Sequence, residues 1–135
     1  MIADREPRRP HKLRLYLYSA ELAVCHLGPD APIPAWATKG SFHSITRTAH
    51  ELSIVCEFDA APQDVECEGP WRCFEVEGPL DFSLTGVLVS LAVPLAEAGV
   101  SIFAVSSYLT DYVLVPAEQL EVAIDALSVA GHNVQ

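Results

Sequence analysis

One stretch of the chain, residues 71–110 (WRCFEVEGPLDFSLTGVLVSLAVPLAEAGVSIFAVSSYLT), constrains the fold more than any other. It predicts a strand over 72–77, a Gly-Pro turn, a helix over 83–98, a stop at Gly99 and a second strand over 100–107. One helix face is continuous and apolar, with residues at offsets 0, 3, 4, 7 and 11 (Leu84, Val87, Leu88, Leu91 and Leu95). The opposite face is hardly more polar, so both faces of this helix must be covered, by the protein's own sheet and by a second surface.

The residues after this stretch complete a recognisable order of elements. Residues 112–115 predict a strand, and Pro116 stands where a helix should begin. The apolar residues that follow have helical spacing and predict a helix that ends at Gly131. These residues are Leu120, Ala123, Ile124 and Leu127. The order is then β-α-β-β-α, with 132–135 placed to begin a fourth strand. This is the split βαβ plan of an α+β, ferredoxin-like fold.

The first half of the chain predicts only β-structure. Alternation over 13–17 and short apolar runs at 22–27, 42–46 and 52–56 predict four strands. Three prolines make 28–40 irregular, with at most one helical turn at 34–37. Residues 57–70 are rich in Pro, Gly and acidic side chains and predict a connector with one helical turn near Gln63.

The net charge of the chain limits the classes of binding partner that we expect. The chain has 135 residues and a net charge of −10, and from Leu15 onward there are three basic residues against sixteen acidic ones. Such a surface repels phosphate backbones and anionic lipid, so we expect neither nucleic-acid nor membrane binding. Five of the eight basic residues lie in the first fourteen positions, and residues 1–12 predict a disordered, solvated basic tail.

The cysteines and the hydropathy pattern indicate a cytoplasmic protein. Four cysteines are too few and too irregularly spaced for a disulfide framework. Cys25, Cys56 and Cys73 lie in apolar runs, where a free thiol acts as a small buried hydrophobe. No secretory leader and no apolar run near the ~20 residues of a membrane span is visible.

The chemistry-bearing residues favour binding over catalysis. No nucleophile elbow, P-loop, HExxH or dinucleotide motif occurs, and the histidines and cysteines lack metal-ligand spacing, so we expect no enzyme activity, no metal and no cofactor. The polar turn GPLDFSLTG stands where the predicted helix begins, and the free N–H groups of a helix start can hold an anion. Asp81 and Ser83 equally suit helix capping, and Gly86 falls one turn inside the predicted helix.

Three segments closely resemble the short bacterial ACT-domain proteins: WRCFEVEGPLDFSLTG, SLAVPLAEAGVSIFAVSSYLTDYVLV and APIPAWATKGSFHSITRTAHELSIVC. These proteins are similar to the ACT modules of aspartate kinase and of the CASTOR arginine sensors. The resemblance implies βαββαβ regulatory modules that bind amino acids or other small effectors, usually between two modules. It implies two tandem units here, an irregular one over 13–69 and a complete one over 70–135.

The resemblance also implies where an effector would bind. The turn 78–86 would contact it, the start of the second strand would be the partner surface, and the SSYLTD segment would supply an aspartate. Leu84 departs from the arginine sensors, which carry an acidic residue there, and this argues against arginine. The implied ligand-binding residues are Asp81, Phe82, Ser83, Thr85, Gly86, Gly99, Val100, Ser101, Ile102, Ser106, Ser107, Tyr108 and Asp111.

Two functions remain open at this stage. The first is a sensor of the ACT type that binds a free amino acid, assembles as a homodimer and has no catalytic activity. The second is a dimerisation or partner-docking module that binds no small molecule, which the doubly apolar helix supports directly.

Overall fold

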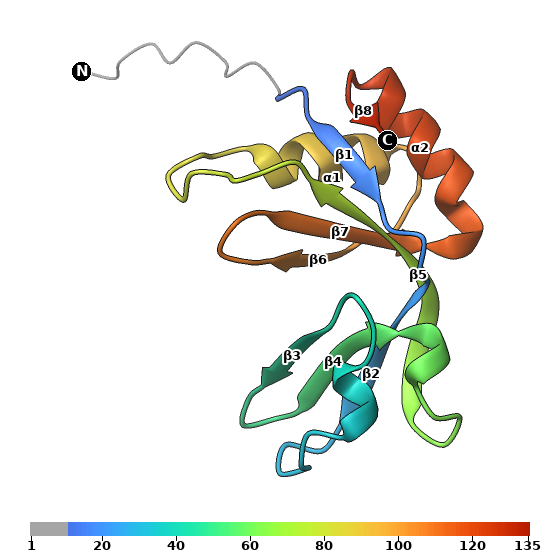
Figure 1. Cartoon of the computed structure of the whole chain (residues 1–135). Helices are drawn as coiled ribbons and strands as arrows, with labels where there is room; N and C mark the ends of the chain where they lie inside the picture. The colour runs from blue at the N-terminus through green and yellow to red at the C-terminus, as the bar shows by residue number, and fades with distance from the viewer. Residues whose placement is uncertain (1–10) are drawn as a thin grey trace.

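The computed structural model describes residues 11–135. Most of the predicted tail, residues 1–12, therefore lies outside the described residues. The chain forms a mixed α+β structure, as predicted, in which eight strands make one sheet and two helices cover part of it (Figure 1). The elements are β1 Arg14–Leu17, β2 Leu22–Leu27, β3 Ser44–Arg47, β4 Leu52–Glu57, β5 Glu66–Val76, α1 Val87–Glu97, β6 Phe103–Ser106, β7 Asp111–Pro116, α2 Leu120–Val129 and β8 Asn133–Val134.

Strand β5 is shared by both halves of the molecule. Its first residues pair with β2, in the register Cys25↔Cys67, and its last residues pair with β1 on one side and β7 on the other. Its 11 residues span about 36 Å. Figure 1 shows the result as two lobes, one of β2, β3 and β4 and one that carries both helices, with β5 running from one to the other.

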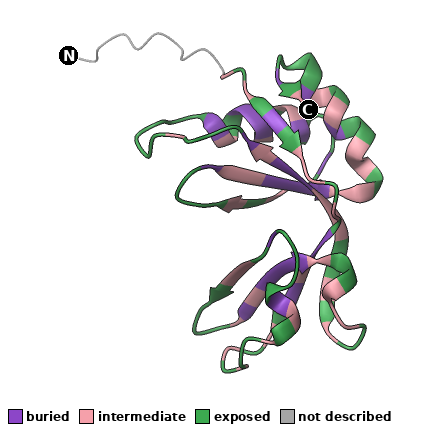
Figure 2. Cartoon of the chain, viewed as in Figure 1, coloured by how far each residue is buried: buried purple, intermediate pink, exposed green. Residues whose placement is uncertain are grey.

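The helical lobe has the predicted βαββαβ order, β5-α1-β6-β7-α2-β8. The expected fourth strand is present as β8, and β1 lies between it and β5. One face of this sheet packs against both helices and carries one of the buried clusters of the molecule (Figure 2). This cluster includes Leu15, Phe74 and Val76 from the strands, Val87, Leu91 and Leu95 from α1, and Ala123 and Leu127 from α2.

The other lobe is irregular. It consists of β2, β3, β4 and the start of β5, with short 3-10 helices at Ala35–Thr38 and Phe58–Ala60. It has a small core of its own, formed by Ala23, Cys25, Ala37, Leu52, Ile54 and Cys56. The fold is thus an ACT-like arrangement whose first unit lacks the helices of the second.

The prediction for the long helix was wrong at its start. Helix α1 begins at Val87, because Gly86 has φ +84 and interrupts the helix there. The backbone N–H and the hydroxyl of Ser83 both donate to Asp81 Oδ1, which closes a turn before the helix. Asp81 and Ser83 therefore do not cap the helix, and Gly86 precedes the helix instead of lying inside it.

Two predictions for the first half were also wrong. The connector is shorter than 57–70, because β5 begins at Glu66 and pairs with β2, and the helical turn lies at Phe58–Ala60. Cys25 is not a free thiol: it is joined to Cys67 across that strand pair, with 4.1 Å between the two Cα atoms. Cys56 and Cys73 are free and buried as predicted, and burial raises the pKa of the Cys73 thiol to about 12.

His132 supplies a hydrogen bond that α1 lacks because of Pro94. Pro94 has no N–H, so the carbonyl of Ser90, four residues earlier, has no helical donor. The His132 ring is buried and its Nε2 lies 2.8 Å from that carbonyl oxygen. The Leu13 N–H donates to His132 Nδ1 at 3.1 Å, which assigns the proton to Nε2. One ring therefore joins α1, β1 and the end of α2.

His132→Ala should lower the free energy of unfolding by about 3 kcal/mol, since it leaves the buried Ser90 C=O and the partly buried Leu13 N–H without partners. Urea unfolding of the full chain measures the change. His50→Ala, which removes an exposed ring, is the matched control and should change stability by less than about 0.5 kcal/mol. Equal effects of the two substitutions would contradict the role of His132.

Candidate functional site

Strand pairing brings the predicted binding segments together. Strands β5 and β7 are antiparallel, with Glu75 opposite Tyr112. The turn 78–86 leaves the end of β5 at the edge of the sheet where the link 107–110 enters β7. The two segments are distant in sequence and adjacent in space for this reason.

Short contacts hold the turn against the link. The Leu80 N–H donates to the Leu109 carbonyl at 2.7 Å, and the buried Thr110 hydroxyl donates to the Val76 carbonyl at 2.6 Å. The rings of Phe82 and Tyr108 meet edge to face, with 4.9 Å between their centroids. The two loops therefore form one structural unit.

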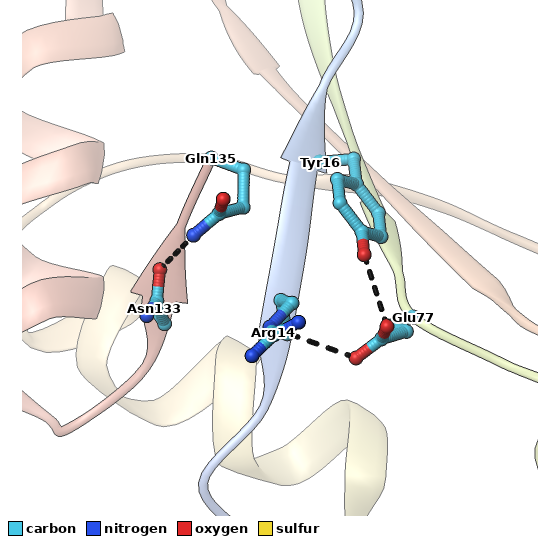
Figure 3. A network of polar contacts seen from close by, with 5 residues as sticks. All are labelled: Arg14, Tyr16, Glu77, Asn133 and Gln135. Carbon is cyan, nitrogen blue, oxygen red and sulfur yellow. Dashed lines mark hydrogen bonds and ion pairs between the residues drawn. The ribbon is translucent and has the colours of Figure 1, made fainter.

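The base of the turn is tied to β1. Glu77, which directly precedes the turn, accepts a hydrogen bond from the Tyr16 hydroxyl at 2.9 Å and lies 3.7 Å from Arg14 (Figure 3). The same view shows Asn133 and Gln135 on the other side of β1, joined by a hydrogen bond between their side chains. These contacts are exposed and individually weak, and the contacts of Glu77 join the base of the turn to β1.

A cavity of about 160 Å³ lies between the turn and the link. It brings together six of the predicted ligand-binding residues: Asp81, Phe82, Ser106, Ser107, Tyr108 and Asp111. Val87, the first residue of α1, also lines it. The site thus combines one helix start, two carboxylates and two aromatic rings.

The cavity lies between a partial positive charge and negatively charged carboxylates. The N–H groups of Val87, Leu88 and Val89 have no acceptor within the helix, because the first helical bond is Ser90 N–H to Gly86 C=O. They give the helix start a partial positive charge. Asp111 contributes a half-buried carboxylate, and Asp81 a second one, whose pKa is lowered by the hydrogen bonds from Ser83. A zwitterion matches this distribution.

The other predicted residues lie elsewhere in the single chain. Ser83 bonds to Asp81 and does not line the cavity. Thr85 and Gly86 line a larger hollow of about 520 Å³ on the outer side of α1. The segment 99–102, made of Gly99, Val100, Ser101 and Ile102, follows the far end of α1, where the Val100 N–H bonds to the Leu95 carbonyl.

Five lining residues were not among the implied ligand-binding residues: Leu80, Leu84, Val87, Leu109 and Thr110. Leu80 and Leu84 lie in the turn 78–86 that the resemblance placed at the effector, whereas Val87 belonged only to the predicted apolar helix face. Leu109 and Thr110 lie within the SSYLTD segment, but the resemblance implied ligand contacts only for its two serines, its tyrosine and its aspartate. Their direction depends on the turn conformation, which no periodic pattern reveals.

A second polar cluster lies on the sheet face that the helices leave open. Tyr112 donates to Glu75 at 3.0 Å, and its ring meets Phe42 from the other lobe with centroids 5.0 Å apart. Burial, with a smaller effect of Glu75, raises the pKa of Tyr112 to about 12. This cluster connects the two lobes beside the link 107–110.

Neither metal binding nor membrane spanning is indicated within residues 11–135. No three His, Cys, Asp or Glu side chains in that range gather as a metal site. No helix in the same range has the length and apolarity to cross a bilayer.

Gly78→Ala should destabilise the protein by about 2 kcal/mol, because an added Cβ would meet the Leu109 carbonyl oxygen at 3.0 Å and Thr110 Cβ at 3.2 Å. Thermal or urea unfolding measures the loss. Gly28→Ala is the control, since its added Cβ meets no atom within 4 Å. If the two variants were equally stable, the turn would not be packed against the link.

Known families and structures agree with this architecture. An ACT-domain family model matches residues 66–129, and a model of an N-terminal domain matches residues 20–64. No curated protein matches the chain significantly. ACT domains are regulatory modules, and the comparisons indicate no catalytic family.

Three solved structures are similar over nearly the whole chain. A protein from Agobacterium tumefaciens is 41% identical, with 93% of each chain covered and a TM-score of 0.87. A protein of unknown function from Vibrio cholerae is 20% identical, with 89% of this chain and 91% of that chain covered and a TM-score of 0.73. The regulatory subunit of aspartate kinase from Thermus flavus is 16% identical, with 86% and 95% covered and a TM-score of 0.59. The last two likenesses concern the fold alone. The family match, the fold and the order of its strands together show that this chain belongs to the ACT-domain family.

Proposed function

We propose that this regulatory ACT protein binds a free amino acid in the cavity between the turn 78–86 and the link 107–110. The observation that carries the proposal is the pairing of opposite charges in one small cavity. A helix start lies at one side and the Asp111 carboxylate lines the same space. An amino acid presents the complementary pair of charges a few ångströms apart.

The amino acid would bind with its two charged groups at fixed places. Its α-carboxylate would accept hydrogen bonds from the N–H groups of Val87 and Leu88 at the start of α1. Its ammonium group would donate to Asp111, a charge-assisted contact. Ser106 would supply an additional hydroxyl partner at the end of β6.

A second copy of the chain would complete the site. The cavity is smaller than the 300–1,000 Å³ of ordinary ligand pockets. The side chains of Phe82 and Tyr108 are 74% and 77% exposed beside it, a large aromatic surface to leave in water. We propose that the 99–102 segment of a second copy covers this surface in a homodimer. Ligand binding and assembly would then be coupled.

Asp111→Asn should abolish the response to the effector while the fold is retained, since the amide keeps the shape and removes the charge that faces the ammonium. A thermal-shift screen of the twenty amino acids at millimolar concentration measures it. At least one amino acid should raise the Tm of the wild-type chain, and the same one should not shift the variant. Asp125→Asn, on the exposed side of α2, is the control and should respond as the wild type does. No shift of the wild-type chain by any amino acid would refute the proposal.

A docking module without a small ligand is the second candidate. Val89 and Val93 on the outer side of α1 are 61% and 48% exposed, and they lie one helical turn apart. A partner protein could cover them. In that case sedimentation would show assembly that no amino acid changes, and Asp111→Asn would leave the assembly intact.

A further inference from the structure

We infer that His11 is a positioning residue for the proposed amino-acid site, because it holds Thr85 and Gly86, the two residues that precede α1. The inference rests on the proposed function, since it explains what keeps the helix start that we assign to the α-carboxylate in place. His11 lines the larger hollow on the outer side of α1 and does not line the cavity. It would therefore act through the turn and would not touch the bound amino acid.

The start of α1 lacks the usual means of fixing a helix terminus. Gly86 is the N-cap residue and has no side chain, so no side-chain hydrogen bond caps the helix there. Its φ of +84 is a value that glycine adopts about as readily as a negative one. Gly86 therefore does not hold the chain in the observed conformation by itself, and contacts from other residues have to do so.

His11 supplies such contacts to the peptide groups on both sides of the Gly86 Cα atom. Its ring Nε2 lies 2.8 Å from the Thr85 carbonyl oxygen, which can only accept, and this assigns the proton to Nε2. The backbone N–H of His11 donates to the Ser90 hydroxyl at 3.1 Å, and that hydroxyl donates to the Gly86 carbonyl at 2.8 Å. The His11 ring also packs beside Gly86, since its Nε2 and Cδ2 atoms would lie 3.7 and 3.8 Å from a Cβ added there.

These contacts determine the direction of a group that we assign to the ligand. A peptide group is planar, so the direction of the Gly86 carbonyl fixes that of the Val87 N–H, which belongs to the same peptide. Val87 lines the cavity, and its N–H is one of the two groups that we assign to the α-carboxylate. A change in the backbone angles of Gly86 would turn this N–H and weaken its hydrogen bond to the amino acid.

The segment 11–13 is itself held against α1. The Leu13 N–H donates to His132 Nδ1, and His132 Nε2 binds the Ser90 carbonyl. Ser90 is thus bound at its carbonyl by His132 and at its hydroxyl by the His11 N–H. His11 therefore approaches the turn from a chain segment whose own position is fixed by hydrogen bonds.

Isothermal titration calorimetry of the full chain, with the amino acid that raises its Tm most, measures the role of His11. His11→Leu keeps an apolar group of similar size beside Gly86 and removes the ring donor. We expect about threefold weaker binding, within the roughly fivefold that a net hydrogen bond of about 1 kcal/mol supplies. His11→Gln should bind as the wild type does, because its side-chain amide can still donate to the Thr85 carbonyl.

Glu97→Gln is the matched control, because Glu97 lines the same hollow as His11 but lies at the other end of α1. It should leave the affinity unchanged, and weakening equal to that of His11→Leu would place the ligand in that hollow and overturn the inference. Wild-type affinity in His11→Leu, or equal losses in His11→Leu and His11→Gln, would overturn the inference while the proposed function stood. Binding of no amino acid by the wild-type chain would overturn both.

Discussion

The antiparallel pairing of β5 with β7 is the constraint on which the rest of the site depends. The register that sets Glu75 opposite Tyr112 decides that the chain leaving Val76 meets the chain entering Asp111. A shift of one residue would turn every side chain of β7 to the other face of the sheet. Buried Val113 and Val115 on the helical face resist such a shift, because the core beneath α1 needs them there. The position of the cavity therefore depends on core packing as well as on the two loops that line it.

Helix α1 shows how distant residues compensate for local irregularity. Gly86 stops the helix from extending back into the turn and thereby leaves Val87, the first residue of the helix, beside the cavity. Pro94 removes one backbone bond near the other end, and His132 replaces it from the last residues of the chain. The helix start that we assign to the effector is thus held in place by contacts from β1 and from the end of α2.

Much of the fold could be predicted from periodicity. Strand β2 has the predicted bounds, Leu22–Leu27, and the order of elements after Trp71 is confirmed, because alternation and helical spacing report burial directly. The start of α1 was missed because the apolar pattern continues to Leu84, while the φ of Gly86 stops the helix. The Cys25–Cys67 bond was missed because it depends on the register between β2 and β5, which only the three-dimensional structure reveals. The resemblance named both loops that line the cavity, and it also named Thr85, Gly86 and the 99–102 segment, which lie outside this cavity in the single chain.

The account centres on an amino acid held between the start of α1 and the Asp111 carboxylate. Amide chemical shifts of uniformly ¹⁵N-labelled protein, titrated with alanine, test that placement most directly. The account predicts saturable shifts that are largest at Val87, Leu88, Leu109 and Asp111, with small changes at Val93 and Ala130, which line the larger hollow on the other side of α1. Largest shifts at Val93 and Ala130, or no saturable shift at the start of α1, would contradict it.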